Sequence, residues 1–93
     1  MSAFDLCVAN RESGEPGSES ASTVNWHIVD LPYEGAYQWM PATWEAAGGG
    51  RYGSASSATP EQQTIIFNSY EPSHRTSWPL SVPACGGVMR NEP

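Results

Sequence analysis

The sequence contains no lysine, and its four arginines face ten acidic residues, for a net charge of −6 over 93 residues. Proteins bind nucleic acid and anionic membrane surfaces mainly through Lys and Arg. A chain with this excess of negative charge is therefore expected to bind both poorly. The same balance opposes electrostatic attraction to any other anionic polymer. We therefore expect neither a nucleic-acid partner nor a membrane partner.

Long apolar runs are also missing, whereas a transmembrane helix needs about 20 apolar residues in succession. The first apolar segment, residues 3–9, is short, lacks a basic start and contains Asp5, so it does not have the pattern of a secretory signal. A Met followed directly by the domain leaves three origins open. These are a piece excised from a longer protein, a mature domain with an added Met, and a protein that leaves its cell by another route.

Cysteine is scarce as well, with only Cys7 and Cys85 in the chain. Two interpretations are open: one long-range disulfide, or two buried free thiols in a reducing compartment. Closing a loop of about 80 residues contributes about 4–5 kcal/mol in the chain-entropy model. Residues 1–93 form one domain by length, and a chain this short has a modest core, so we favour the disulfide.

The first helix is predicted between a suitable N-cap, Ser2, and a suitable stop, Gly14. On it Phe4, Val8 and Glu12 share one row, so the carboxyl group closes an apolar stripe. A helix C-terminus disfavours negative charge by about 0.3–1 kcal/mol, and partial burial acts in the same direction. Both effects favour the protonated form that a general acid needs. The alternative is a solvated Glu at a helix end.

The next part of the chain is poor in helix signals. Residues 15–24 have the composition of a flexible, solvated loop. Residues 25–29 are typical of a short extended piece, residues 30–32 of a turn, and residues 33–39 of a strand or a loop. This part therefore predicts at most a residual β-hairpin.

Two more helices follow. One is predicted over residues 41–47, with Pro at its first position and three glycines behind it. Residues 59–62 form a capping-box signature that opens a helix ending near residue 70, with Ile65 and Ile66 on its core face.

The end of the chain is predicted to be irregular. Prolines at positions 79 and 83 exclude a long helix. Trp78 and Cys85 are the residues expected to anchor this segment to the core. A tail is expected after residue 87. The sum is a mainly α domain (small α+β) with three short helices, long loops and a cleft between the helical parts.

Four motifs occur in order along the chain. They are Cys7 with Arg11-Glu12-Ser13-Gly14, Tyr33-Glu34-Gly35-Ala36-Tyr37-Gln38-Trp39, Ala42-Thr43-Trp44-Glu45, and Ala58-Thr59-Pro60-Glu61-Gln62-Gln63. Completed by Trp78-Pro79 and Cys85, their order and spacing resemble the resuscitation-promoting-factor or transglycosylase-like domain, a reduced relative of the lysozyme fold.

The resemblance implies a lysozyme-like fold and cleavage of the β-1,4 bond between N-acetylmuramic acid and N-acetylglucosamine in peptidoglycan. Glu12 matches the catalytic acid, and Tyr33 and Gln38 match cleft positions near the sugar. Cys7 and Cys85 match a disulfide that ties the catalytic helix to the tail. The resemblance implies no cofactor, a glycan-strand partner and an extracellular, cell-wall or virion-associated location.

Aromatic residues near Gln38 are further candidates for contact with the sugar. Tyr33, Tyr37 and Trp39 are predicted to stack on sugar rings, although alternation places at least one of Tyr37 and Trp39 in the core. Trp44 is predicted to be structural. The family's Gln-Gly-Trp run before the last Cys is absent, so its sugar contact does not carry over.

A hydrolase usually needs a second carboxylate, for which Asp30, Glu34 and Glu45 are the candidates. A lytic transglycosylase needs none, because the muramyl 6-hydroxyl attacks the anomeric carbon and one Glu both gives and takes the proton. His27 and His74 lack partners at metal-ligand spacing, so no metal is expected. Two non-catalytic alternatives stay open: a glycan-binding module, and a structural piece of a cell-wall or virion assembly.

Overall fold

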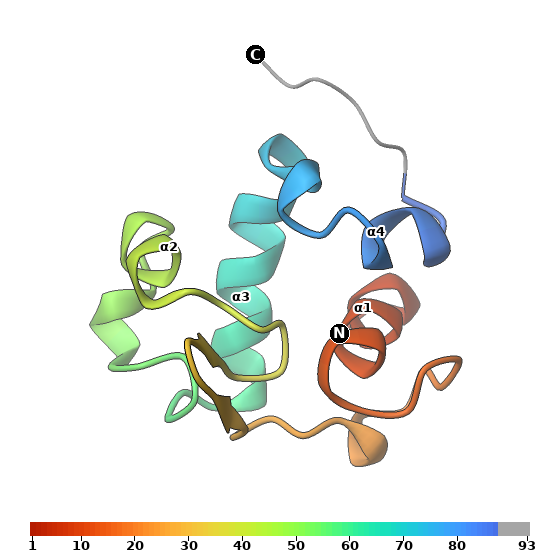
Figure 1. Cartoon of the computed structure of the whole chain (residues 1–93), viewed down its shortest axis with the longest axis horizontal. Coiled ribbons are helices and arrows are strands. Elements are labelled where there is room, and N and C mark those ends of the chain that lie inside the picture. The colour runs from red at the N-terminus through yellow and green to blue at the C-terminus, as the bar shows by residue number, and fades with distance from the viewer. Residues whose placement is uncertain (88–93) are drawn as a thin grey trace.

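Two helices of 11 residues each carry the fold of residues 1–87, the part of the chain that the computed structural model describes (Figure 1). These are α1 (Ala3–Ser13) and α3 (Pro60–Tyr70). The shorter helices are α2 (Pro41–Ala46) and α4 (Ser81–Ala84), with 3₁₀ turns η1 (Ala21–Thr23), η2 (Gly49–Tyr52), η3 (Glu71–Ser73) and η4 (Arg75–Ser77). In Figure 1, α3 runs between α2 on one side and the pair α1 and α4 on the other. The predicted mainly helical class is confirmed.

Both long helices begin where their capping residues predict. The Asp5 backbone N–H donates to the Ser2 hydroxyl at 3.1 Å, and the Ser2 N–H donates back to the Asp5 carboxylate at 2.9 Å. Thr59 and Gln62 make the same reciprocal pair at the start of α3, at 3.1 and 3.0 Å. Each box satisfies two donors that a helix start leaves without partners.

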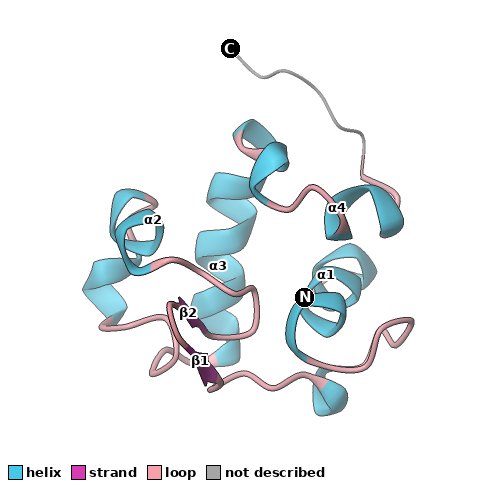
Figure 2. Ribbon diagram, in the orientation of Figure 1, coloured by secondary structure: helices cyan, strands magenta, loops and turns pink. Residues whose placement is uncertain are grey.

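The predicted residual hairpin is present and small (Figure 2). Strands β1 (Val29–Asp30) and β2 (Tyr33–Glu34) pair antiparallel, with a cis peptide between Leu31 and Pro32 in the turn. A second, four-residue turn follows at once. It is closed by two 2.9 Å backbone hydrogen bonds between Glu34 and Trp39.

Aromatic rings form the centre of the core. Tyr37 and Phe67 stack with ring centroids 4.2 Å apart, and Trp39 meets Trp44 and Trp78 edge to face at 5.6 and 5.2 Å. Such pairs contribute about 0.5–1.5 kcal/mol each beyond their buried area. The predicted structural role of Trp44 is therefore consistent with its place in this cluster.

One core prediction for α3 is wrong. Ile66 is buried, but Ile65 is 50% exposed. The buried face instead passes through Gln63 and Phe67, because the Gln63 amide binds the backbone of Trp26 and Ala36 at 2.7 and 2.8 Å. These bonds fix the rotation of α3 and turn Ile65 outward.

Residues 15–24, predicted as a flexible solvated loop, fold back onto α1. The buried Asn10 side chain donates to the Ser20 carbonyl at 3.1 Å and accepts from the Thr23 hydroxyl at 2.6 Å and from the Glu15 N–H at 3.1 Å. The Asn10 side-chain amide thus supplies hydrogen-bond partners to a loop that has no regular backbone pairing of its own. The polar composition of the segment conceals this organisation.

The end of the described chain is tied to its beginning. Cys7 and Cys85 form a disulfide, as predicted. Trp78, the other expected anchor, is buried and donates its indole N–H to the Tyr37 carbonyl at 2.9 Å. The sequence missed the short helix α4 that lies between these anchors and packs beside α1 (Figure 1).

Candidate functional site

Glu12 lies on the last turn of α1 and lines an open hollow of about 280 Å³. Arg11, Tyr33, Gln38 and Ser77 complete the lining. The hollow therefore joins three segments that are distant in sequence: the end of α1, the hairpin with its following turn, and the segment that precedes α4. Tyr33 and Gln38, which the family resemblance matches to cleft positions near the sugar, line the same hollow as Glu12.

A second hollow of about 230 Å³ shares three of those residues, Tyr33, Gln38 and Ser77. Its other lining residues are Trp39, Met40, Thr43 and Trp78. Because the two hollows share a wall, we treat them as one groove, called the Glu12 groove below. Sequence reasoning missed Met40, Thr43 and Ser77, which no motif singles out for a role in binding.

Gln38 holds an unusual backbone conformation in the wall of the groove. Its φ of 56° is the one positive φ of a non-glycine residue in residues 1–87. Its backbone N–H and its side-chain N–H both donate to the Gly35 carbonyl at 3.1 Å. A non-glycine residue in the left-handed region costs about 1–3 kcal/mol, and such residues gather at functional sites. The conformation presents the Gln38 side chain at the groove.

The assignment of Tyr37 to a sugar ring is wrong. Tyr37 is completely buried, and its hydroxyl pairs with the Thr64 hydroxyl at 2.9 Å. Burial raises the pKa of the Tyr37 phenol well above its usual range, partly offset by the hydrogen bond to Thr64. The turn that closes between Glu34 and Trp39 directs the Tyr37 ring into the core, so Tyr37 has a structural role.

Trp39 touches the groove without offering it a ring face. Its side chain is 2% exposed because Trp44, Tyr70 and Trp78 pack around it. Stacking on a sugar by Trp39 is therefore also wrong. Tyr33 differs, since it is 44% exposed at the rim and is the ring available for stacking.

One contact of Glu12 comes from the far end of the chain. The Ser81 hydroxyl donates a hydrogen bond to Oε2 of Glu12, and no other residue in 1–87 hydrogen-bonds this side chain. Ser81 begins α4 and is 3% exposed. Sequence reasoning missed it, although a signal existed. Ser81 lies one helical turn before Cys85, and the disulfide brings that turn to α1.

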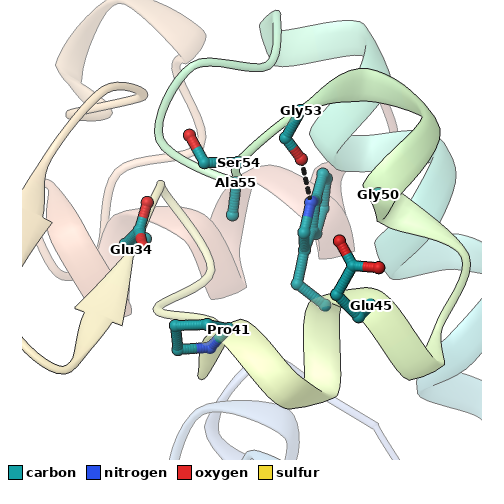
Figure 3. A pocket seen from close by; sticks show the side chains of 8 residues that line it. Glu34, Pro41, Glu45, Gly50, Gly53, Ser54 and Ala55 are labelled. Atoms are coloured by element: carbon teal, nitrogen blue, oxygen red, sulfur yellow. Dashed lines mark hydrogen bonds between the residues drawn. The ribbon is translucent and has the colours of Figure 1, made fainter.

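The other candidate carboxylates lie elsewhere. Asp30 is exposed on β1, whereas Glu34 accepts a hydrogen bond from Ser56 at 2.6 Å. Glu34 and Glu45 both line a separate hollow of about 260 Å³, drawn in Figure 3, which also shows the Trp44 indole bonded to the Gly53 carbonyl. Glu12 is thus the one carboxylate that lines the groove within residues 1–87.

Each histidine pairs with a backbone carbonyl. His27 pairs with the Ser56 carbonyl, and His74 pairs with the Tyr70 carbonyl while its ring stacks on Tyr70 at 3.7 Å. Over residues 1–87 no group of three or more His, Cys, Asp or Glu side chains is placed to hold a metal ion. In the same residues no helix has the length and apolar character to cross a membrane.

Two sequence comparisons identify no relative of the chain. No protein-family model matches the chain, and no curated protein matches its sequence. The family resemblance therefore depends on the motifs and their order, and the function has to be argued from the Glu12 groove itself.

Proposed function

We propose that the chain is a peptidoglycan-cleaving glycosidase similar to the resuscitation-promoting-factor or transglycosylase-like domains. It acts on the β-1,4 bond between N-acetylmuramic acid and N-acetylglucosamine, and Glu12 is its general acid and base. The observation that carries the proposal is a single carboxylate in the wall of an open groove that is also lined by an exposed Tyr33 and by Gln38 with its positive φ.

The reaction favoured by a single carboxylate is an intramolecular transfer. Glu12 donates its proton to the bridging oxygen as the bond from that oxygen to the anomeric carbon breaks. The 6-hydroxyl oxygen of the same muramyl residue forms a new bond to the anomeric carbon and returns its proton to Glu12. The product is a 1,6-anhydro sugar, no water is consumed, and the acid is regenerated.

Proximity supports this route. The attacking hydroxyl is already tethered to the sugar that holds the anomeric carbon, so no second reactant has to be ordered. A hydrolase would need a carboxylate across from Glu12 to activate water or to form a covalent intermediate. Asp30 and Glu34 do not line the Glu12 groove, which makes the transfer the better fit.

The remaining groove residues bind and orient the glycan strand. Tyr33 offers a half-exposed ring for an apolar sugar face, and Gln38 offers an amide for hydroxyl or N-acetyl groups. Glycan strands of the cell wall lie outside the cytoplasm, where disulfides such as Cys7–Cys85 persist. We propose that the chain acts there, alone or within a larger cell-wall or phage protein.

The test is digestion of purified peptidoglycan by the wild-type chain and by Glu12→Gln, with mass spectrometry of the released muropeptides. We expect anhydro-muramyl ends from the wild type and no release by the variant. The two possible products differ by one water. Reducing ends alone mean a hydrolase, in which case Asp30 and Glu34 become the carboxylates to replace. Saturable binding to glycan strands without release means a binding module.

A further inference from the structure

Ser81 hydrogen-bonds the candidate acid Glu12, although Ser81 belongs to none of the motifs that carry the family resemblance. Ser81 is 3% exposed and does not line the groove, so its hydroxyl is not a substrate contact. We propose that Ser81 is a positioning residue that holds Oε2 of Glu12 and leaves Oε1 to carry the transferable proton. The inference rests on the proposed function, since it assigns a task within that reaction.

Ser81 is fixed from both sides along the chain. Three residues earlier, Trp78 is anchored by its indole N–H on the Tyr37 carbonyl at 2.9 Å, and its own carbonyl accepts from the Val82 N–H at 3.0 Å. Four residues later, the Cys85 N–H donates to the Ser81 carbonyl at 3.0 Å, and Cys85 is bonded to α1. The hydroxyl therefore has a defined position relative to the helix that carries Glu12.

The chemistry of a serine hydroxyl explains the choice of oxygen. The hydroxyl has one proton to donate, and the structure directs it to Oε2 of Glu12. A neutral carboxylic acid carries one proton, and its carbonyl oxygen is the better hydrogen-bond acceptor, so donation by Ser81 to Oε2 favours protonation of Oε1. Within residues 1–87 no other residue hydrogen-bonds either oxygen. Oε1 is therefore the oxygen that is available to the bridging oxygen of the glycan.

The same hydrogen bond serves the middle of the reaction. Glu12 is a carboxylate after it has given its proton away and before the 6-hydroxyl returns one. A donor on Oε2 stabilises that charged form, because hydrogen bonds to ionised groups are the stronger ones. Arg11 and Tyr33 are the other titratable side chains that line the hollow, and neither hydrogen-bonds Glu12.

The test removes the donor in two ways. Ser81→Ala deletes the hydroxyl. Ser81→Thr keeps a hydroxyl, whereas Ser81→Val has a methyl group of similar volume in its place, so this pair isolates the effect of the donor. Val82→Ala is the matched structural control, because Val82 is fully buried in the same helix and its side chain has no hydrogen-bonding group to offer Glu12. For each variant we would measure kcat, KM and the pH dependence of kcat on soluble glycan strands, together with the melting temperature.

We expect kcat of Ser81→Ala to fall about 10- to 100-fold with little change in KM, because the proton is no longer directed. The alkaline limb of its pH profile moves up by about one pH unit, the amount that a lost hydrogen bond to a carboxylate gives. Ser81→Thr keeps the wild-type profile, and Ser81→Val repeats the shift. Val82→Ala lowers the melting temperature and leaves the pH profile in place.

Two results separate this inference from the proposed function. A wild-type chain that cleaves glycan, with Ser81→Ala and Ser81→Val at the wild-type rate and pH profile, overturns the role of Ser81 alone. A pH profile that moves equally in Val82→Ala also overturns it, since loosening α4 then explains the effect. A wild-type chain without turnover overturns the proposed function and the role of Ser81 with it.

Discussion

Cys7 on α1 and Cys85 directly after α4 are joined by a disulfide across 78 residues, with their Cα atoms 5.8 Å apart. This bond places α4 beside α1 and so brings Ser81 to Glu12. A structural crosslink and the geometry of the candidate acid are thus parts of one arrangement.

Replacing both cysteines by serine should lower the free energy of unfolding by about 2–4 kcal/mol, because the loop closed by the disulfide is long. Urea denaturation of Cys7→Ser/Cys85→Ser beside the wild type measures the loss. The control is Ser22→Ala, which alters an exposed residue of η1 and should unfold as the wild type does. Equal stability of the cysteine variant and the wild type would contradict the prediction.

Glu12→Gln should reduce glycan cleavage by about 10²–10⁴-fold, because the amide keeps the shape of the side chain without a transferable proton. The rate of muropeptide release measures the loss, and circular dichroism checks that the fold is retained. Glu45→Gln is the matched control, since it removes a carboxylate that lines the separate hollow. The assignment fails if Glu12→Gln cleaves glycan at the rate of the control.

Neighbouring isoleucines on α3 should respond very differently to truncation. Ile66 is 1% exposed, so Ile66→Ala should cost about 2–5 kcal/mol through lost burial and a cavity. Ile65 is 50% exposed, so Ile65→Ala should cost less than about 1 kcal/mol. Thermal or urea unfolding of the two variants measures both, and similar losses would mean that the face of α3 is misassigned.

The buried Gln63 amide should be among the costliest polar groups to remove. It accepts from the Ala36 N–H and donates to the Trp26 and Ala58 carbonyls at 2.8, 2.7 and 2.9 Å. Gln63→Leu leaves all three without this partner and should cost about 2–5 kcal/mol. Gln62→Leu removes only half of a capping box and should cost about 1 kcal/mol. Unfolding measurements that rank the two in the opposite order would contradict this prediction.

Glu71 should make stability depend on pH. Burial raises the pKa of Glu71 above its ordinary value, and the Arg75 guanidinium 2.9 Å away only partly offsets this. From about pH 4.3 up to the raised pKa, the folded chain keeps a proton that the unfolded chain has lost, so stability falls as pH rises. The free energy of unfolding of the wild type minus that of Glu71→Gln should therefore decrease from pH 4 to pH 7. A constant difference would contradict the prediction.

Local signals were enough to predict α1, α2 and α3 and, together with motif order, to single out the candidate acid. Ser2 and Thr59 start α1 and α3 because a capping side chain and the backbone that it satisfies lie within three residues of each other. The mainly helical class and the Cys7–Cys85 bond were also predicted from the sequence. Glu12 could be singled out because helix position and motif order are both properties of the linear chain.

Contacts between distant segments were decided only by the tertiary structure. Gln63 rotates α3 through its bonds to Trp26 and Ala36, which no helical period reveals, and so Ile65 faces outward. Tyr37 lies in the core because the turn after β2 closes between Glu34 and Trp39. Side-chain hydrogen bonds and ring packing act over a few ångströms in space, whatever the separation in sequence. For the same reason Ser81 reaches Glu12 only once the chain has folded.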